Sequence, residues 1–319
     1  MVADMGRVAR ISTRHDAVWR ECARCGVPAP LAPDEQHCSS CRQAQRQPEP
    51  KPEQERAGRR PRVDAGSVRL TARDLAALSW LADMKAIYEP DVAALVAGLP
   101  AAPGAVAGYR PSPRAVRFLL SRWRRAGVAE PQRLVAGRSR IVRVTTRGAA
   151  LIGVDGFRET AEVTAYHQCE VSRLRLWLES RPSPSLGQLV GWESERAFRA
   201  DLDALGLSRR GEAERERMHV PDGVATYERG ERVAVEVERA VKAPARLARI
   251  VEQLLTDYPV TLYAVASGEV RRAVLAAERA ARRTLGHRQI SADRIGALSV
   301  IDLPDSAVPD DEPGREGAA

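Results

Sequence analysis

Four cysteines in two closely spaced pairs constrain this chain more than any other feature. Cys22 and Cys25 form one Cys-x2-Cys turn, Cys38 and Cys41 form another, and twelve residues separate the pairs. Each turn directs two thiolates at one ion, and two turns complete a tetrahedral all-thiolate site. A module this short has too few apolar residues to fold without that ion. We therefore predict a zinc-binding module over residues 1–42.

The predicted zinc is structural, because four thiolates leave no open coordination position for catalysis. The alternatives are disulfide bonds or cysteines that no longer bind metal, and His37 is a competing ligand. Cys169 lies apart in the sequence and is expected to be a small buried hydrophobic side chain.

Two segments are predicted to be unstructured. Residues 43–67 are rich in Pro, Gln, Glu and Arg and almost free of apolar side chains, so we expect a flexible linker. Residues 304–319 are acidic and rich in Pro and Gly, which predicts a disordered tail. The chain between them is long and apolar enough to bury real cores.

The charge of the chain favours a polyanionic partner. The formal net charge is +8, and almost all of the 50 basic residues are arginine. Residues 1–20 contain no apolar core of a secretory signal. The longest uncharged run, Val92 to Tyr109, is interrupted by prolines and glycines, so no membrane span is expected. We expect a cytoplasmic protein that associates with the nucleoid or with plasmid DNA.

Residues 68–155 have the pattern of a winged helix-turn-helix domain. Thr71 is expected to cap a first helix, a second helix covers about Glu89 to Leu99, and Ser112-Pro113 begins a third helix that Gly127 ends. Two strands follow, over Arg133 to Val135 and Ile141 to Val144, and form a hairpin. Val116, Leu119, Leu120 and Trp123 recur at helical spacing on the third helix and are expected to face the core.

Arginines on the third helix and the hairpin predict contact with double-stranded DNA. Val68 to Ala150 contains fourteen Lys and Arg against five Asp and Glu. We expect Arg114, Arg117 and Arg124 in or beside the major groove, and Arg138 and Arg140 at the phosphate backbone. The alternative is a solvated arginine face on a domain that contacts other proteins.

Residues 160–303 alternate between helices and strands, which predicts an α/β domain. Helices are expected over Val163 to Glu179, Glu193 to Leu205, Ala245 to Asp257 and Val270 to Leu285. Strands are expected near Leu207 and over His219 to Tyr227, Val233 to Glu238, Val260 to Ala266 and Ala297 to Leu303. The core order is helix, three strands, helix, strand.

Acidic residues in this region are arranged as ligands for a divalent ion. Period-two alternation places Glu236 and Glu238 on one face of a strand, opposite three valines. Asp222 on the preceding strand and Glu195 on an upstream helix are expected to approach that face. Such carboxylates suit Mg²⁺ or Mn²⁺, and Lys242 is placed to offset negative charge that develops during phosphodiester hydrolysis. The alternative is a half-exposed strand with a charged outer face and Asp222 in an ordinary turn.

Three motifs carry a resemblance to known proteins. They are Trp192-Glu193-Ser194-Glu195, His219-x-Pro221-Asp222-Gly223 and Glu236-Val237-Glu238-x3-Lys242. They resemble the PD-(D/E)xK nuclease superfamily and, more closely, the replication-relaxation family of plasmids and integrative elements, over roughly Val68 to Leu303. The resemblance implies a restriction-endonuclease-like αβββαβ domain with Asp222 and Glu236 as metal ligands. The superfamily places its lysine two residues after the acid, where this chain has Glu238, so Lys242 would act as a displaced lysine.

These observations predict a DNA-binding replication-relaxation protein that nicks or remodels duplex DNA with a divalent metal, as a metal-dependent endonuclease. Expected partners are double-stranded DNA, replication or conjugation proteins, and a second copy in a homodimer. Two alternatives stay open. One is a non-enzymatic replication initiator whose acids are structural, and the other is a transcription regulator whose C-terminal domain only dimerises.

Overall fold

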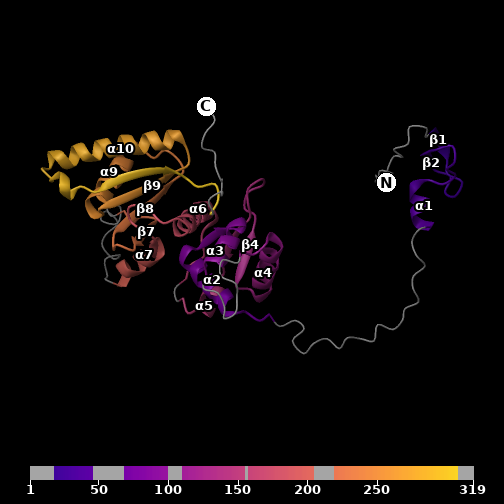
Figure 1. Ribbon diagram of the computed structural model, residues 1–319, viewed down its shortest axis with the longest axis horizontal. Helices are drawn as coiled ribbons and strands as arrows, with labels where there is room; N and C mark the ends of the chain where they lie inside the picture. Colours follow the sequence, from indigo (N-terminus) through magenta and orange to yellow (C-terminus); the bar gives the residue numbers. More distant parts are fainter. Residues whose placement is uncertain (1–17, 46–67, 100–109, 155–156, 205–218, 308–319) are drawn as a thin grey trace. The chain divides into compact units, whose positions relative to one another are not determined.

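The computed structural model describes residues 18–45, 68–99, 110–154, 157–204 and 219–307 (Figure 1). The chain divides into two compact units, residues 1–67 and 68–319. The second unit alternates helices and strands, so the α/β class is confirmed. Within the described ranges, no helix is long and apolar enough to cross a membrane. The predictions for 43–67 and 304–319 fall almost entirely on residues outside those ranges.

The first unit is a β-hairpin followed by a short helix. Strands β1 (Val18–Glu21) and β2 (Pro28–Leu31) pair antiparallel, and helix α1 (Ser39–Gln45) follows. Gly26 adopts φ +69° in the turn after β1, a conformation that costs glycine little. Leu31 and Ala32 are buried, but few other apolar side chains are.

The second unit begins with helices around a three-stranded sheet. The elements are α2 (Ala72–Met84), β3 (Ala86–Tyr88), the 3₁₀ turn η1 (Glu89–Asp91), α3 (Val92–Gly98), α4 (Pro113–Ala126), β4 (Ala129–Gln132), β5 (Ile141–Val144) and α5 (Thr146–Leu151). The sheet order is β3-β5-β4, with both pairs antiparallel. Leu78, Leu81, Leu120 and Trp123 are central to its core.

The helix boundaries follow from the caps that the sequence predicts. Thr71 and Asp74 form a capping box at the start of α2. The Ser112 hydroxyl accepts a hydrogen bond from the Ala115 amide, and Pro113 occupies the first helical position of α4. Gly127 ends α4 with φ +68°.

The hairpin differs from its prediction. Its first strand is β4 at Ala129–Gln132, not Arg133 to Val135, because Gln132 already pairs with Ile141 of β5. The residues after Gln132 therefore belong to the loop between the strands, where the Arg133 guanidinium donates to the Arg138 carbonyl at 2.7 Å. Strand β3 was not predicted, because three residues carry no periodic signal of their own.

The remainder of the second unit is a five-stranded mixed sheet with helices on both faces. The elements are α6 (Glu162–Glu179), β6 (Leu189–Ser194), α7 (Glu195–Ala204), β7 (Gly223–Tyr227), β8 (Arg232–Glu238), α9 (Pro244–Asp257), β9 (Val260–Val265), α10 (Gly268–His287), η3 (Ala292–Arg294) and β10 (Ala297–Asp302). The strand order is β10-β9-β8-β7-β6. Strands β6, β7 and β8 form an antiparallel meander, whereas β8, β9 and β10 are parallel.

Strand β6 of this sheet was not predicted from the sequence, and one predicted strand falls outside the described residues. Strand β6 carries a register shift between Leu189 and Gly191, which breaks the alternation that marks a strand. The strand expected near Leu207 lies outside the described residues.

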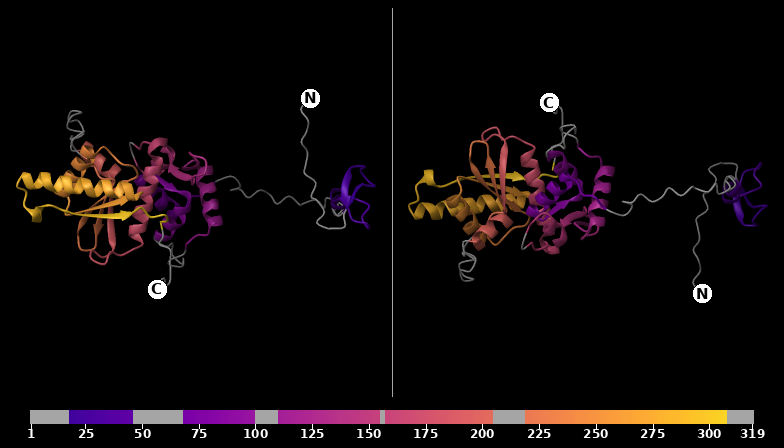
Figure 2. Two further views of the ribbon diagram at one scale, coloured as in Figure 1. Left: turned by 90° about the horizontal axis from the view of Figure 1, so that it is seen from above. Right: turned by 90° about the horizontal axis from the view of Figure 1, so that it is seen from below.

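Helices cover both faces of the central strands of the sheet (Figure 2). Helices α9 and α10 pack on one face, around Ala234 and Tyr263. Helix α6 packs on the other, against Val233, Val235 and Val237. The expectation that valines and glutamates of β8 face opposite sides is confirmed. The alternative of a half-exposed strand is wrong, because Glu236 is only 3% and Glu238 only 5% exposed.

Helix α6 joins the two parts of the second unit. Leu176 belongs to the core around α2 and α4, whereas Val171 and Leu174 pack on β8. Tyr166 and Cys169 pack against Ile141 of β5. The burial of Cys169 confirms its expected role as a small hydrophobic side chain.

Candidate metal centre, basic helix and acidic cluster

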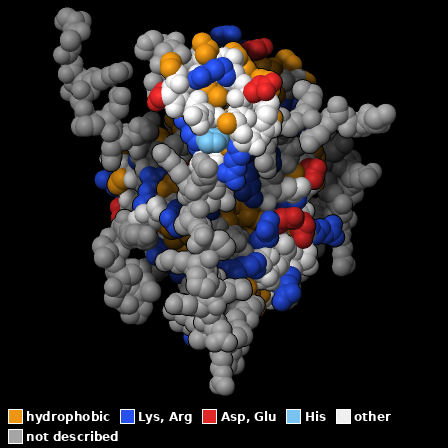
Figure 3. Space-filling view, turned by 90° about the vertical axis from the view of Figure 1, so that its right-hand side faces the viewer, with side chains coloured by type: hydrophobic (Ala, Val, Ile, Leu, Met, Phe, Trp, Pro, Cys, Tyr) orange, Lys and Arg blue, Asp and Glu red, His pale blue; other side chains and the backbone are white. Residues whose placement is uncertain are grey.

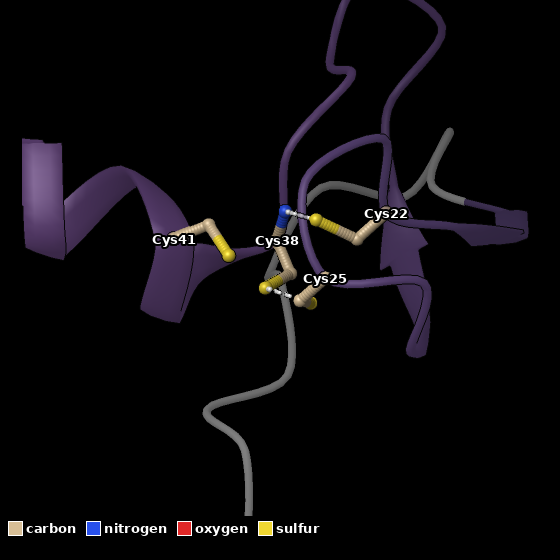
Figure 4. A group of neighbouring side chains, drawn as sticks. All are labelled: Cys22, Cys25, Cys38 and Cys41. Atoms are coloured by element: carbon tan, nitrogen blue, oxygen red, sulfur yellow. Dashed lines mark hydrogen bonds between the residues drawn. The ribbon is translucent and has the colours of Figure 1, made fainter.

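The sulfur atoms of the four predicted cysteine ligands lie close together (Figure 4). Their sulfur atoms all lie within 4.8 Å of one another, and the sulfurs of Cys25 and Cys38 are 3.8 Å apart. A tetrahedron of sulfurs about 2.3 Å from zinc has edges of about 3.8 Å. Cys22 and Cys25 follow β1, and Cys38 and Cys41 flank the start of α1. The donor set and its spacing therefore fit a structural zinc ion.

The electrostatics of the four sulfurs also favour a cation. The Cys38 amide donates to the Cys22 sulfur at 3.2 Å and, with further backbone amides, lowers the pKa of Cys22 to about 5. Burial and the neighbouring cysteines raise the pKa of Cys41 to about 12. Four thiolates cannot share this space without a compensating charge, which a divalent ion supplies.

Helix α4 has a buried apolar side and an exposed basic side. Val116, Leu120 and Trp123 are buried, as predicted, and Leu119 packs against the same core. Arg114, Arg117 and Arg124 are exposed, and none of them forms an ion pair with any residue that the structure describes. In the space-filling view of Figure 3, Lys and Arg side chains are blue and Asp and Glu side chains are red, and both kinds are visible.

The two predicted arginines of the hairpin have partners within the protein. The guanidinium of Arg138 lies 5.2 Å from the ring centre of Tyr166 on α6. Arg140 forms an ion pair with Glu89 at 3.3 Å and donates to the Pro131 carbonyl at 3.2 Å. Arg117 and Arg140 both line a cavity of about 660 Å³ between α4 and the hairpin.

Two of the predicted acids come together at one end of β7 and β8. Asp222 directly precedes β7, opposite Glu236 on β8. Burial raises the pKa of Glu236 to about 7, and the charge of Asp222 acts in the same direction. One Asp222 oxygen accepts a hydrogen bond from the Val237 amide at 2.8 Å, which fixes the carboxylate at the strand end.

Glu238 and Lys242 pair with each other beside this cluster. The Lys242 ammonium lies 2.6 Å from a Glu238 carboxylate oxygen. The predicted proximity of Lys242 to the acids is therefore present, but its direct partner is Glu238. Lys242 is close enough to Glu236 to lower the pKa of that carboxyl group in opposition to burial.

The prediction that Glu195 joins the acids is not met by the geometry. Glu195 is the first residue of α7 and forms an ion pair with Arg199 at 2.8 Å. In the part of the chain that the structure describes, no ion pair or hydrogen bond links Glu195 to Asp222 or Glu236. The helix begins at Glu195, so its carboxylate turns along α7 and pairs one turn later.

Sequence reasoning missed the partners of the two acids. His167 on α6 lies 2.9 Å from Asp222, and His219 lies 2.7 Å from Glu236. Gln253 of α9 holds the His219 backbone through two hydrogen bonds, at 2.9 and 3.1 Å. His219 belongs to the motif His219-x-Pro221-Asp222-Gly223. His167 lies 55 positions before Asp222, and no local sequence pattern links His167 to Asp222.

A buried tyrosine completes the surroundings of the acids. Tyr263 of β9 is the register partner of Glu236, and its hydroxyl has no hydrogen-bond partner among the described residues. Burial and the charges of Glu236, Glu238 and Asp222 raise the pKa of Tyr263 well above its ordinary value.

The acids and histidines form two separate pairs. Among the described residues, the four cysteines are the one group of three or more His, Cys, Asp or Glu side chains whose ligand atoms lie within 4.8 Å of one another. Asp222 and Glu236 are thus near each other, but each is engaged by an imidazole. In this arrangement Asp222 is paired with His167, and Glu236 is paired with His219.

Compared with family models, with curated proteins and with solved structures, the chain matches none. What the protein does is therefore inferred from its own side chains.

Proposed function

We propose that the protein binds double-stranded DNA through α4. The observation that carries this proposal is the composition and exposure of that helix. Pro113–Ala126 contains five arginines and no acidic residue. One of them, Arg122, is paired with buried Asp74, and the other four are exposed.

An arginine-rich helix of this kind fits the major groove. The groove is wide enough for one α-helix, and guanidinium groups pair well with both phosphates and guanine edges. Arg117 and Arg124 lie two turns apart on α4, and neither has an acidic partner in the described structure. Arg117 lines the cavity beside the hairpin. The order α2, α3, α4 and the β4–β5 hairpin before α6 is the order expected of a winged helix, and it supports docking of the third helix in this way.

The salt dependence of DNA binding tests this proposal. Each neutralised phosphate contributes about −0.9 to the slope of log K against log salt concentration. We expect the Arg117→Ala, Arg124→Ala double variant to reduce the slope by about 2 in fluorescence anisotropy with a short duplex. The control is Arg272→Ala, Arg279→Ala, which removes two exposed arginines from α10 and should keep the slope. If both double variants gave the same slope, DNA binding would have to be assigned to a surface other than α4.

A second candidate function is metal-dependent hydrolysis of the bound DNA. The succession α6, β6, β7, β8, α9, β9, with α7 after the first strand, has the order expected of the αβββαβ core of PD-(D/E)xK nucleases, and this order supports the proposal. In that arrangement Asp222 and Glu236 would hold Mg²⁺ or Mn²⁺ after their histidine partners move away, and Lys242 would stand nearby. The ion would polarise the phosphodiester and activate a water molecule.

Nicking of supercoiled plasmid in the presence of Mg²⁺ or Mn²⁺ tests this second function. Asp222→Asn should abolish nicking, whereas Asp201→Asn, an exposed change on α7, should leave it intact. If supercoiled DNA stays intact with both ions, the nuclease function is excluded, and the protein would be a non-enzymatic DNA-binding initiator or regulator.

The resemblance to the replication-relaxation family suggests a biological setting. We infer a role in the replication or transfer of a plasmid or integrative element, together with replication or conjugation proteins or as a homodimer. The structural zinc would fold the first unit independently of the DNA-binding unit. Recovery of the protein on plasmid DNA in cells, lost in the Arg117→Ala, Arg124→Ala variant, would support that setting.

A further inference from the structure

An exposed phenylalanine lies among the arginines of α4. Phe118 is 64% exposed, and it stands one turn after Arg114 and one turn before Ser121 on the solvent side of the helix. The buried side of α4 holds Val116, Leu120 and Trp123 instead. Phe118 therefore contributes little to the core of this unit.

The other two phenylalanines of the chain are better covered. Phe157 packs against the core around α2 and α4, and Phe198 on α7 is partly buried. The guanidinium of Arg114 lies 5.6 Å from the centre of the Phe118 ring, so the ring is bordered by positive charge. An apolar ring on a cationic face favours a partner that is anionic and also offers an apolar group.

Duplex DNA offers such a group in its major groove. The C5-methyl of thymine is the one apolar group that a base edge presents there, and phenylalanine side chains contact it in known complexes. Residues in the first turns of a recognition helix are the ones that reach base edges. Phe118 is the sixth residue of α4, close to the start of that helix.

We propose that Phe118 contacts the C5-methyl group of thymine, so that α4 distinguishes thymine from bases that lack this methyl. This inference rests on the proposed DNA binding by α4. The arginines supply affinity for phosphates in any sequence, and Phe118 adds a preference that depends on the base.

Two duplexes that differ only in this methyl group test the inference. One is an alternating A·T duplex, and the other replaces every thymidine with deoxyuridine, so a methyl is present or absent in every binding register. Burial of one methyl predicts about fourfold tighter binding of the thymine duplex by the full-length protein. Phe118→Ala should bind both duplexes equally and keep the wild-type salt slope. Leu151→Ala, which changes another exposed apolar residue, should keep the fourfold preference.

Each other outcome overturns a definite part of the account. Equal binding of both duplexes by the wild-type protein, or a preference retained in Phe118→Ala, overturns the thymine contact while DNA binding stands. Failure of the wild-type protein to bind either duplex at low salt overturns the proposed function itself. Loss of self-association in Phe118→Ala, with the thymine preference unchanged, would assign the side chain to contact with a second copy.

Discussion

The Nε2 atom of His219 lies 2.7 Å from a carboxylate oxygen of Glu236, which is almost completely buried. Burial and nearby Asp222 raise the pKa of Glu236 to about 7. Burial acts to lower the pKa of His219, but the hydrogen bond to Glu236 outweighs burial and raises this pKa above its ordinary value. The pair therefore holds more protons in the folded protein than the same groups hold in the unfolded chain.

This excess of bound protons predicts a loss of stability as pH rises. A group whose folded pKa is raised stabilises the fold fully below its unfolded pKa and loses that contribution as pH rises through the folded pKa. Between about pH 5 and about pH 8, we expect the free energy of unfolding of the wild-type protein to fall by up to about 3 kcal/mol more than that of Glu236→Gln. Urea unfolding without added divalent ions measures both.

The control for this comparison is Glu130→Gln, an exposed change on β4. Its pH dependence should follow that of the wild-type protein. A Glu236→Gln variant with an unchanged pH profile would show that Glu236 does not carry the excess proton.

The cysteine cluster predicts that metal loss and unfolding of the second unit are separate events. We expect about one zinc per chain, lost in Cys22→Ser and retained in Cys169→Ala. Because residues 1–67 form their own compact unit, the melting temperature of the second unit should not change in Cys22→Ser. Elemental analysis and calorimetry measure these quantities, and a full zinc content in Cys22→Ser would contradict the assignment.

Asp74 predicts a large stability effect in the helical part of the second unit. Its carboxylate accepts hydrogen bonds from the Thr71 amide at 2.7 Å and from the Trp123 indole at 2.8 Å, and it pairs with Arg122 at 2.5 Å. Burial acts to raise the pKa of Asp74, but these bonds outweigh it and lower the pKa below its ordinary value. The stabilisation is therefore present at neutral pH and is lost as pH falls through the folded pKa.

Asp74→Ala removes the capping box and leaves a buried indole N–H without a partner. We expect the free energy of unfolding at neutral pH to fall by about 2 to 4 kcal/mol. Urea denaturation followed by circular dichroism measures this free energy. The control is Glu130→Ala, which removes an exposed acidic side chain. A change below about 0.5 kcal/mol in Asp74→Ala would contradict the role assigned to these contacts.

The sequence predicts features of this fold that depend on local chemistry. The caps at Thr71, Ser112 and Gly127 and the cysteine turns are each specified by residues a few positions apart. Strands β3 and β6 depend on pairing with distant strands, so no local pattern marks them. The alternation in β8 predicts the two faces of the strand, but only the packing of α9 and α10 buries its glutamates.

The candidate site likewise combines features that the local sequence predicts with features that depend on tertiary packing. The convergence of Asp222 and Glu236 follows from hairpin register, which the sequence allows one to expect. The pairing of Asp222 with His167 depends on where α6 packs, and the partner of Glu195 depends on where α7 begins. Tertiary packing decides the first pair, which spacing alone does not reveal, whereas Glu195 and Arg199 form a local i,i+4 pair within α7.

Site-specific crosslinking from α4 tests the central claim most directly. A photoreactive amino acid replaces Ser121, which is exposed between Arg117 and Arg124, and the full-length protein is irradiated with labelled duplex. The same group at Ala276, exposed on α10, is the control. We predict efficient crosslinking from position 121 and little from position 276. Equal crosslinking from both positions, or crosslinking from position 276 alone, would contradict DNA binding by α4.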